Sequence, residues 1–168
     1  MADPHIRAQL DYWDMITVIC YRCGFVLASI GVGLLPYQFP IAVILVLVAA
    51  VLCASSLHIY LKHFRLLLQF ATWVALVCQI CGLTELALGG AFVTLGGLCF
   101  KEYFCFRILG LNLQPFFFAV LWVVVVMKIV ILVQIMAAIC AVLFLFLAIQ
   151  KWRMPLHFDI GDKTKYQI

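Results

Sequence analysis

The chain has 168 residues, of which 68% are hydrophobic and 11% are charged. A soluble domain has about half of its residues apolar and about a quarter charged, so this composition excludes an ordinary soluble protein. The net charge is +4, but the basic residues are scattered singly or in pairs and form no stripe that would bind nucleic acid.

Long uncharged intervals separate the few charged residues. A helix needs about 20 mostly apolar residues to cross a hydrocarbon core of roughly 30 Å. The intervals therefore predict an all-α, polytopic transmembrane helical bundle, surrounded by membrane lipids and with six spans as the favoured number. The uncharged intervals are 23–61, 66–84, 86–100, 108–127 and 129–150.

In chain order, a short amphipathic lead is expected first, and its rings Tyr12 and Trp13 are of the kind that settle at headgroup level. Pro36 and Pro40 predict a tight turn between the first two spans. The expected elements are the lead over 1–15, a first span over 16–35, and a second span that follows the turn and ends at about 60. A third span is expected over 66–83, a fourth over 86–106, two more within 116–150, and a tail over 151–168. Residues 16–150 thus form the predicted transmembrane domain.

The apolar run 116–150 would measure about 52 Å as one helix, which is too long for a single crossing. Two helices that meet in a hairpin account for this length. The turn of the hairpin is expected at Lys128 or nearer Gln134.

Basic residues in short loops collect on the cytoplasmic side of a membrane. With the N terminus inside, six spans place the basic residues on or near the cytoplasmic side, apart from Lys128. Five spans would place the basic C-terminal tail outside. The charge pattern therefore predicts that both termini are cytoplasmic.

Five polar residues are expected at one depth, near the cytoplasmic ends of the first, second and fourth spans: Arg22, His58, Tyr60, Lys101 and Glu102. Ionisable groups inside a membrane are costly and indicate function by default. A buried charge persists when it is paired, so Arg22 and Glu102 are expected to form an ion pair. This predicts a cytoplasm-facing polar pocket for a headgroup, a quinone ring, an ion or a proton. The alternative is that Arg22, Tyr60 and Lys101 reach the interface and only anchor the helices.

Two C-x-x-C sequences, Cys20 with Cys23 and Cys78 with Cys81, have the residue types that bind zinc or an iron–sulfur cluster. In the six-span topology the two pairs lie at different depths, so they cannot form one site. We expect these cysteines to be small packing residues, with no metal site. A haem held by two histidines is not expected either, because only His58 is a credible ligand within a span. The cofactor is therefore left open.

Short segments spread over most of the chain resemble a family of integral membrane proteins of cyanobacteria and proteobacteria, described as a domain of unknown function. The segments are Tyr21-Arg22, His58-Ile59-Tyr60, Phe100-Lys101-Glu102 with Phe104-Cys105-Phe106, and Asp159-Ile160-Gly161-Asp162-Lys163. The resemblance implies a multi-span helical protein of a bacterial inner or thylakoid-type membrane, and it supplies no activity, substrate or cofactor. In the tail, Asp159 and Asp162 around Gly161 predict a turn or, equally, a docking segment.

The longest hydrophilic stretch is the tail of 18 residues, which leaves no room for a soluble catalytic domain. Catalytic activity is therefore not expected. The favoured function is that of an accessory subunit or assembly factor that binds other membrane protein subunits or further copies of the chain, because small-residue helix faces suit docking. The alternative is a small transporter or redox-linked protein that binds a quinone, haem or lipid in the polar pocket.

Overall fold

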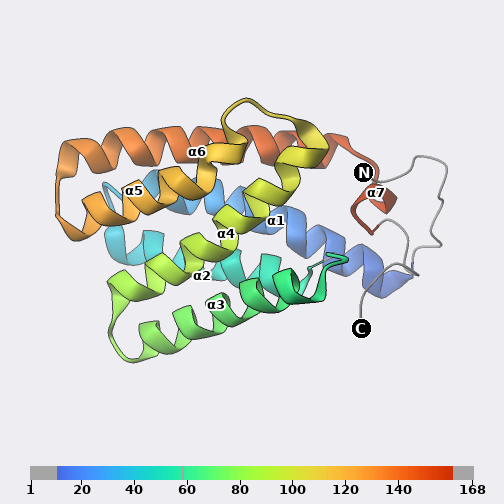
Figure 1. Cartoon of the computed structure of the whole chain (residues 1–168), viewed down its shortest axis with the longest axis horizontal. Coiled ribbons are helices and arrows are strands. Elements are labelled where there is room, and N and C mark those ends of the chain that lie inside the picture. The colour runs from blue at the N-terminus through green and yellow to red at the C-terminus, as the bar shows by residue number, and fades with distance from the viewer. Residues whose placement is uncertain (1–10, 58, 161–168) are drawn as a thin grey trace.

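The structure, a computed structural model, describes residues 11–57 and 59–160, and the regular elements in these ranges are all helical. The elements are α1 (Tyr12–Leu34), α2 (Phe39–Ser55), α3 (Lys62–Ile80), α4 (Thr84–Phe106), the 3-10 helix η1 (Leu111–Leu113), α5 (Gln114–Val126), α6 (Val130–Arg153) and α7 (His157–Ile160). Figure 1 shows α1 to α6 running roughly along the long axis and α7 folded back at one end. The predicted all-α bundle is confirmed.

Each predicted span coincides with one helix, but the helices differ in length. By length and composition, α1, α3 and α6 are long and apolar enough to cross a membrane. The helices α2 and α5 have 17 and 13 residues, which is less than the roughly 20 that a perpendicular crossing needs. The helix α2 ends at Ser55, whereas the sequence predicted an end near Tyr60.

The boundaries of the predicted domain shift slightly. The helix α1 begins at Tyr12, inside the predicted lead, and α6 continues to Arg153, beyond the predicted start of the tail. The predicted tail also contains α7, which packs on α1 and buries Asp159 and Ile160. The tail is therefore part of the folded bundle at least as far as Ile160.

The α5–α6 hairpin turns at Lys128, the first of the two predicted positions. The backbone N–H of Lys128 donates to the carbonyl of Val125 at 3.0 Å, and that of Ile129 donates to Val124 at 3.1 Å. These two bonds form a Schellman motif, in which the residue after the helix adopts the left-handed conformation. Lys128 has a φ of 57°, at a position that glycine usually occupies.

Glycines on α4 let α3 approach closely. A Cβ atom added to Gly90 would lie 2.9 Å from the Cβ of Ala75, and one added to Gly97 would lie 2.7 Å from the Leu68 side chain. Both glycines face α3, and they are seven residues apart, which is about two helical turns. These two glycines are therefore close-packing positions between α3 and α4.

A second glycine pair on α4 faces α5 in the same way. A Cβ atom added to Gly89 would lie 2.9 Å from Nε1 of Trp122, and one added to Gly96 would lie 3.1 Å from Cα of Pro115. Because α4 packs on α3 along one glycine pair and on α5 along the other, it holds these two helices on either side of itself. This arrangement leaves a groove between α3 and α5.

A row of aromatic rings connects the centre of the bundle to one end. Phe92 stacks on Phe118 with ring centroids 4.3 Å apart, and Phe118 lies 5.5 Å from Phe144. Phe144 lies 6.0 Å from Phe25, and Tyr21 meets Phe25 edge to face at 4.9 Å. The row joins α4, α5, α6 and α1, and it ends at the polar hydroxyl of Tyr21, where the charged residues gather.

Candidate functional site

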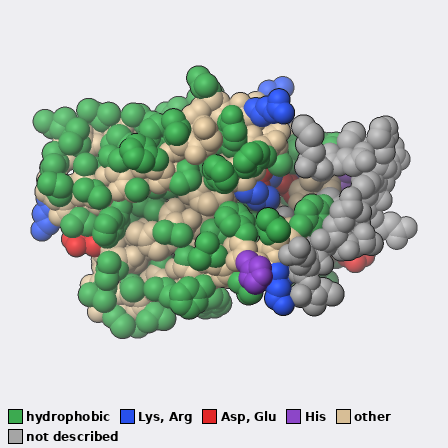
Figure 2. Space-filling view, viewed as in Figure 1, with side chains coloured by type: hydrophobic (Ala, Val, Ile, Leu, Met, Phe, Trp, Pro, Cys, Tyr) green, Lys and Arg blue, Asp and Glu red, His purple; other side chains and the backbone are tan. Residues whose placement is uncertain are grey.

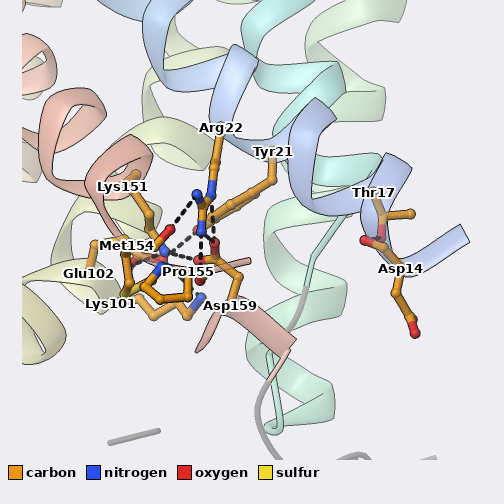
Figure 3. A network of polar contacts seen from close by, with 10 residues as sticks. All are labelled: Asp14, Thr17, Tyr21, Arg22, Lys101, Glu102, Lys151, Met154, Pro155 and Asp159. Carbon is orange, nitrogen blue, oxygen red and sulfur yellow. Dashed lines mark hydrogen bonds and ion pairs between the residues drawn. The ribbon is translucent and has the colours of Figure 1, made fainter. Parts of the chain in front are cut away.

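Arg22 lies on α1 with only 2% of its surface exposed, and it is held by the segment that follows α6. Its Nε and Nη2 atoms donate to Oδ2 of Asp159 at 2.8 and 2.6 Å. Its Nη1 donates to the carbonyl of Met154 at 2.8 Å, and Nη2 also reaches the carbonyl of Pro155 at 3.1 Å. Figure 3 shows the guanidinium surrounded by these acceptors.

Asp159 reaches Arg22 because the chain reverses after α6. The helix ends at Arg153, and Met154 has an extended backbone with φ −88° and ψ 142°. Pro155 follows, and a proline disfavours the helical conformation of the residue before it. The short helix α7 then turns back toward α1 and places the carboxylate of Asp159 inside the bundle.

Glu102 is the second buried carboxylate, with none of its surface exposed. The hydroxyl of Tyr21 donates to Oε1 at 2.7 Å, and Nζ of Lys101 lies 3.0 Å from the same oxygen. Nζ of Lys151 lies 2.8 Å from Oε2. Glu102 is therefore surrounded by donors from α1, α4 and α6.

Lys151 connects the two carboxylates. Its Nζ forms ion pairs with Oε2 of Glu102 and Oδ1 of Asp159, and it lies 5.2 Å from the ring centre of Tyr21. We call the group of Arg22, Lys101, Glu102, Lys151 and Asp159 the ionic cluster. It links α1, α4, α6 and α7 into one charged network (Figure 3).

The ionic cluster contains three cations and two carboxylates, so it has one excess positive charge. Taking an ion out of water costs several kcal/mol, which pairing and hydrogen bonds must offset. Arg22, Glu102 and Lys151 are almost fully buried, and their pairing offsets this desolvation cost. The side chain of Lys101 remains 25% exposed. The excess charge therefore lies nearest the surface.

The structure brings together three of the five predicted site residues, but not with the predicted pairing. Arg22, Lys101 and Glu102 belong to the ionic cluster, as expected from their common depth. Arg22 pairs with Asp159 rather than with Glu102, and Lys151 bridges the two carboxylates, so the predicted direct pair is wrong. The physical reason is that α7 supplies a carboxylate nearer to the guanidinium.

The other two predicted residues are Tyr60 and His58. Tyr60 follows the end of α2 and is 38% exposed, outside the ionic cluster. His58 lies outside the described residues. That these side chains are hydrogen-bonding neighbours of the charged pair stays a prediction.

Sequence reasoning missed Tyr21, Lys151 and Asp159. Lys151 falls at the predicted boundary between the last span and the tail, and Asp159 falls in the predicted turn or docking segment. Two signals point to Tyr21 and Asp159, and none points to Lys151. The predicted pocket had two cations and one carboxylate, so it lacked an acid, and the segments that carried the family resemblance included both Tyr21 and Asp159.

The cluster's chemistry is that of a structural ion network. Asp159 accepts hydrogen bonds from Arg22 and Lys151, and Oε1 of Glu102 accepts them from Tyr21 and Lys101. Oε2 of Glu102 forms an ion pair with Lys151 and accepts no hydrogen bond from the described residues. In the part of the chain that the structure describes, no group of three or more His, Cys, Asp or Glu side chains is placed to hold a metal ion. The arrangement fixes helix positions.

Comparisons with known proteins agree with this membrane architecture. Residues 76–168, from within α3 to the end of the sequence, match the family model of an uncharacterised integral membrane protein (DUF2301). A protein of Haemophilus influenzae, named only as an uncharacterised protein, is 60% identical over 168 residues, which is all of both chains. No solved structure matches the chain. The chain therefore belongs to the DUF2301 family of integral membrane proteins, which confirms the resemblance of its short segments.

Proposed function

We propose that the protein is a non-enzymatic accessory subunit or assembly factor that docks on a transmembrane helix of a larger membrane protein complex. In this proposal the chain crosses a bacterial inner or thylakoid-type membrane six times, with both termini in the cytoplasm. The observation that carries the proposal is an apolar groove of about 540 Å³ between α3 and α5, on the outer side of α4.

The groove has the shape and lining of a helix-docking surface. Its residues on α4 extend from Leu86 to Gly97, which corresponds to about 16 Å along the helix axis. Gly89, Gly90 and Gly97 at its floor hold α3 and α5 close to α4, and the exposed Val93 lies between them. Packing of apolar side chains is a main source of helix association in lipid. The lining consists of Phe64, Leu67, Leu68, Leu86, Gly89, Gly90, Phe92, Val93, Gly97, Pro115, Phe118, Ala119 and Trp122.

The face of α3 outside the groove lining also favours contact with a protein partner over lipid chains. The buried residues of α3 are Leu68, Thr72 and Ala75, so most of its surface is free of intramolecular packing. Trp73 lies near the middle of the helix and is 67% exposed, with Phe70 beside it at 68%. Tryptophan in lipid-facing positions gathers at the headgroups rather than at mid-span. In protein interfaces, by contrast, exposed tryptophan is a frequent anchor.

The ionic cluster supports docking rather than the alternative of a transporter or a quinone-, haem- or lipid-binding protein. That alternative needs ionisable groups that face a ligand. Arg22, Glu102 and Lys151 have at most 2% of their surface exposed and are paired with protein groups. Their role in this proposal is to keep the bundle rigid, so that the groove is formed before the partner binds.

A photo-crosslinking amino acid at Val93 tests the proposal in the native membrane. Val93 lies in the groove and is 53% exposed, and Ile44 on α2, which is 54% exposed, is the matched control. We expect one crosslinked polypeptide from position 93 and none of that species from position 44. We also expect Val93→Trp, which fills the groove, to abolish co-purification of that polypeptide, whereas Ile44→Trp retains it.

Two results would contradict the proposal. One is a full-length chain that purifies from its own membrane in mild detergent as a monomer and forms no crosslink at position 93. The other is a co-purifying polypeptide that Val93→Trp and Ile44→Trp affect equally, because its docking would then not depend on the groove.

A further inference from the structure

A second cleft lies at the end of the bundle opposite the ionic cluster. It has a volume of about 240 Å³ and is enclosed by the α1–α2 turn, the start of α4 and the α5–α6 turn. Glu85, which lines it, precedes Glu102 of the ionic cluster by 17 residues of one helix, or about 25 Å. The cleft is therefore at the level of the opposite headgroups if the ionic cluster lies at the cytoplasmic ones.

The lining of this cleft combines an apolar wall with two opposite charges. The wall consists of Leu35, Pro36, Phe39, Val125, Val130 and Val133, and the charges are those of Glu85 and Lys128. Figure 2 shows an acidic and a basic side chain close together at the left end, surrounded by hydrophobic side chains. An amphiphile with a charged head and an apolar stem matches this lining.

Both charged side chains are available to a ligand. Within residues 11–57 and 59–160, the ion pairs are those of the ionic cluster, and the side chains of Glu85 and Lys128 take part in none of them. Glu85 accepts one hydrogen bond, from Nε1 of Trp122 at 2.7 Å, but through its backbone carbonyl. The carboxylate and the ammonium are both exposed in the cleft.

The backbone at Lys128 adds an independent observation. The α3–α4 turn has the same pair of closing hydrogen bonds as the α5–α6 turn, and there Gly82 adopts a φ of 77°. At the α5–α6 turn Lys128 takes the equivalent left-handed position, which is less favourable for a residue with a Cβ atom than for glycine. A cation at the end of α5 and an acid at the start of α4 each suit the helix dipole. That explains each charge separately, but not why both line one apolar cleft.

We propose that this cleft binds a zwitterionic phospholipid whose headgroup has a primary ammonium. The ammonium donates to the carboxylate of Glu85, the phosphate accepts from Nζ of Lys128, and the first carbons of the acyl chains lie on the apolar wall. An anionic lipid without an ammonium would satisfy Lys128 but would leave the carboxylate of Glu85 without a cation. A quaternary ammonium has no N–H to donate to the carboxylate. The site therefore favours a lipid that has a phosphate together with an ammonium that can donate a hydrogen bond.

Native mass spectrometry of the full-length chain in detergent tests the site with three probe lipids at equal concentration. We expect phosphatidylethanolamine to bind about tenfold more tightly than phosphatidylcholine or phosphatidylglycerol, as expected for one charge-assisted hydrogen bond. Glu85→Gln is expected to remove the preference for phosphatidylethanolamine over phosphatidylglycerol. Lys128→Asn, whose side chain suits the left-handed backbone, is expected to weaken the binding of all three lipids. Lys128→Arg is expected to retain their binding.

Arg107→Gln is the matched control, since Arg107 is also exposed with a positive φ of 50° but lies at the other end of α4. It should leave the lipid preference unchanged. Phosphatidylcholine binding of the unaltered chain as tight as phosphatidylethanolamine binding would overturn the proposal without any variant. So would tighter binding of phosphatidylglycerol, or unchanged preference in Glu85→Gln together with unchanged binding in Lys128→Asn.

Discussion

Arg22 on α1 and Asp159 on α7 are 137 residues apart in sequence and form a buried ion pair, with Nη2 2.6 Å from Oδ2. The same guanidinium binds two backbone carbonyls of the segment that leads into α7. The pair therefore closes the bundle by tying its first helix to its last described element. Four predictions test this closure and the packing around it, and a fifth tests the topology of the chain in the membrane.

Breaking the Arg22 pair is expected to destabilise the protein strongly. Arg22→Met leaves the carboxylate of Asp159 with one cation, Lys151, and the loss of one partner of a buried pair costs about 3–5 kcal/mol. Thermal unfolding in detergent, followed by size-exclusion chromatography, measures the change. The double variant Arg22→Met with Asp159→Leu should recover much of the loss, because an apolar pair needs no desolvation. A wild-type midpoint for the single variant would contradict this account.

Neutralising Glu102 is expected to lower stability more than removing its neutral donor. Glu102→Gln leaves Lys101 and Lys151 without their shared carboxylate and raises the excess positive charge of the cluster. Tyr21→Phe removes only the hydroxyl that donates at 2.7 Å, which is worth about 1.5–3 kcal/mol. Arg107→Gln, at an exposed charged residue outside the cluster, is the control and should have a thermal midpoint near that of the unaltered chain. Equal midpoints for all three variants would show that the cluster does not stabilise the fold.

The close approach of α3 to α4 depends on Gly90. Gly90→Ala places a methyl group 2.9 Å from Cβ of Ala75 and 3.1 Å from the carbonyl of Ala71, atoms that cannot move without the α3 backbone. We expect a loss of about 1–3 kcal/mol, the usual cost of overpacking. Gly33→Ala is the control, since its new Cβ would lie 3.6 Å from Ala141 in ordinary contact. It should be neutral or stabilising by up to about 1 kcal/mol. A tolerated Gly90→Ala would mean that α3 is free to move away from α4.

A hydroxyl pair also joins these two helices. The Oγ1 atoms of Thr72 and Thr94 lie 2.8 Å apart, and both residues are buried. A double-mutant cycle with Thr72→Val and Thr94→Val is expected to give a coupling energy of about 0.6 kcal/mol, typical of hydrogen bonds between helices in lipid. Reversible unfolding in mixed micelles would measure it. Strictly additive effects of the two changes would exclude this contact between the side chains.

The proposed six-span topology predicts that the C terminus lies in the cytoplasm. Green fluorescent protein fused after Ile168 should fluoresce in a bacterial host, because it folds in the cytoplasm, whereas alkaline phosphatase at the same position should be inactive. The expectation follows from the basic residues near this end, Lys151, Arg153, Lys163 and Lys165. The opposite pair of results would place the C terminus outside and exclude six spans with an internal N terminus.

The sequence by itself determined the helical membrane bundle and the depth of its charges. The absence of charge over long intervals left lipid as the only surroundings in which these segments are stable. The same constraint brought Arg22, Lys101 and Glu102 to one level, since ionisable groups within hydrocarbon are tolerated only near water or near each other. The turn at Lys128 was among the predicted positions because one apolar run was too long for a single crossing.

Only the tertiary structure decided which charges pair. Depth along a helix follows from residue counting, but pairing depends on how each helix is rotated about its axis. Neighbouring residues point about 100° apart, so Lys101 remains partly exposed while Glu102 is fully buried. The position of Asp159 depends on the chain reversal after α6, which no periodic pattern encodes. The partner of Arg22 was therefore fixed by the packing of α7 on α1, a contact between distant parts of the chain.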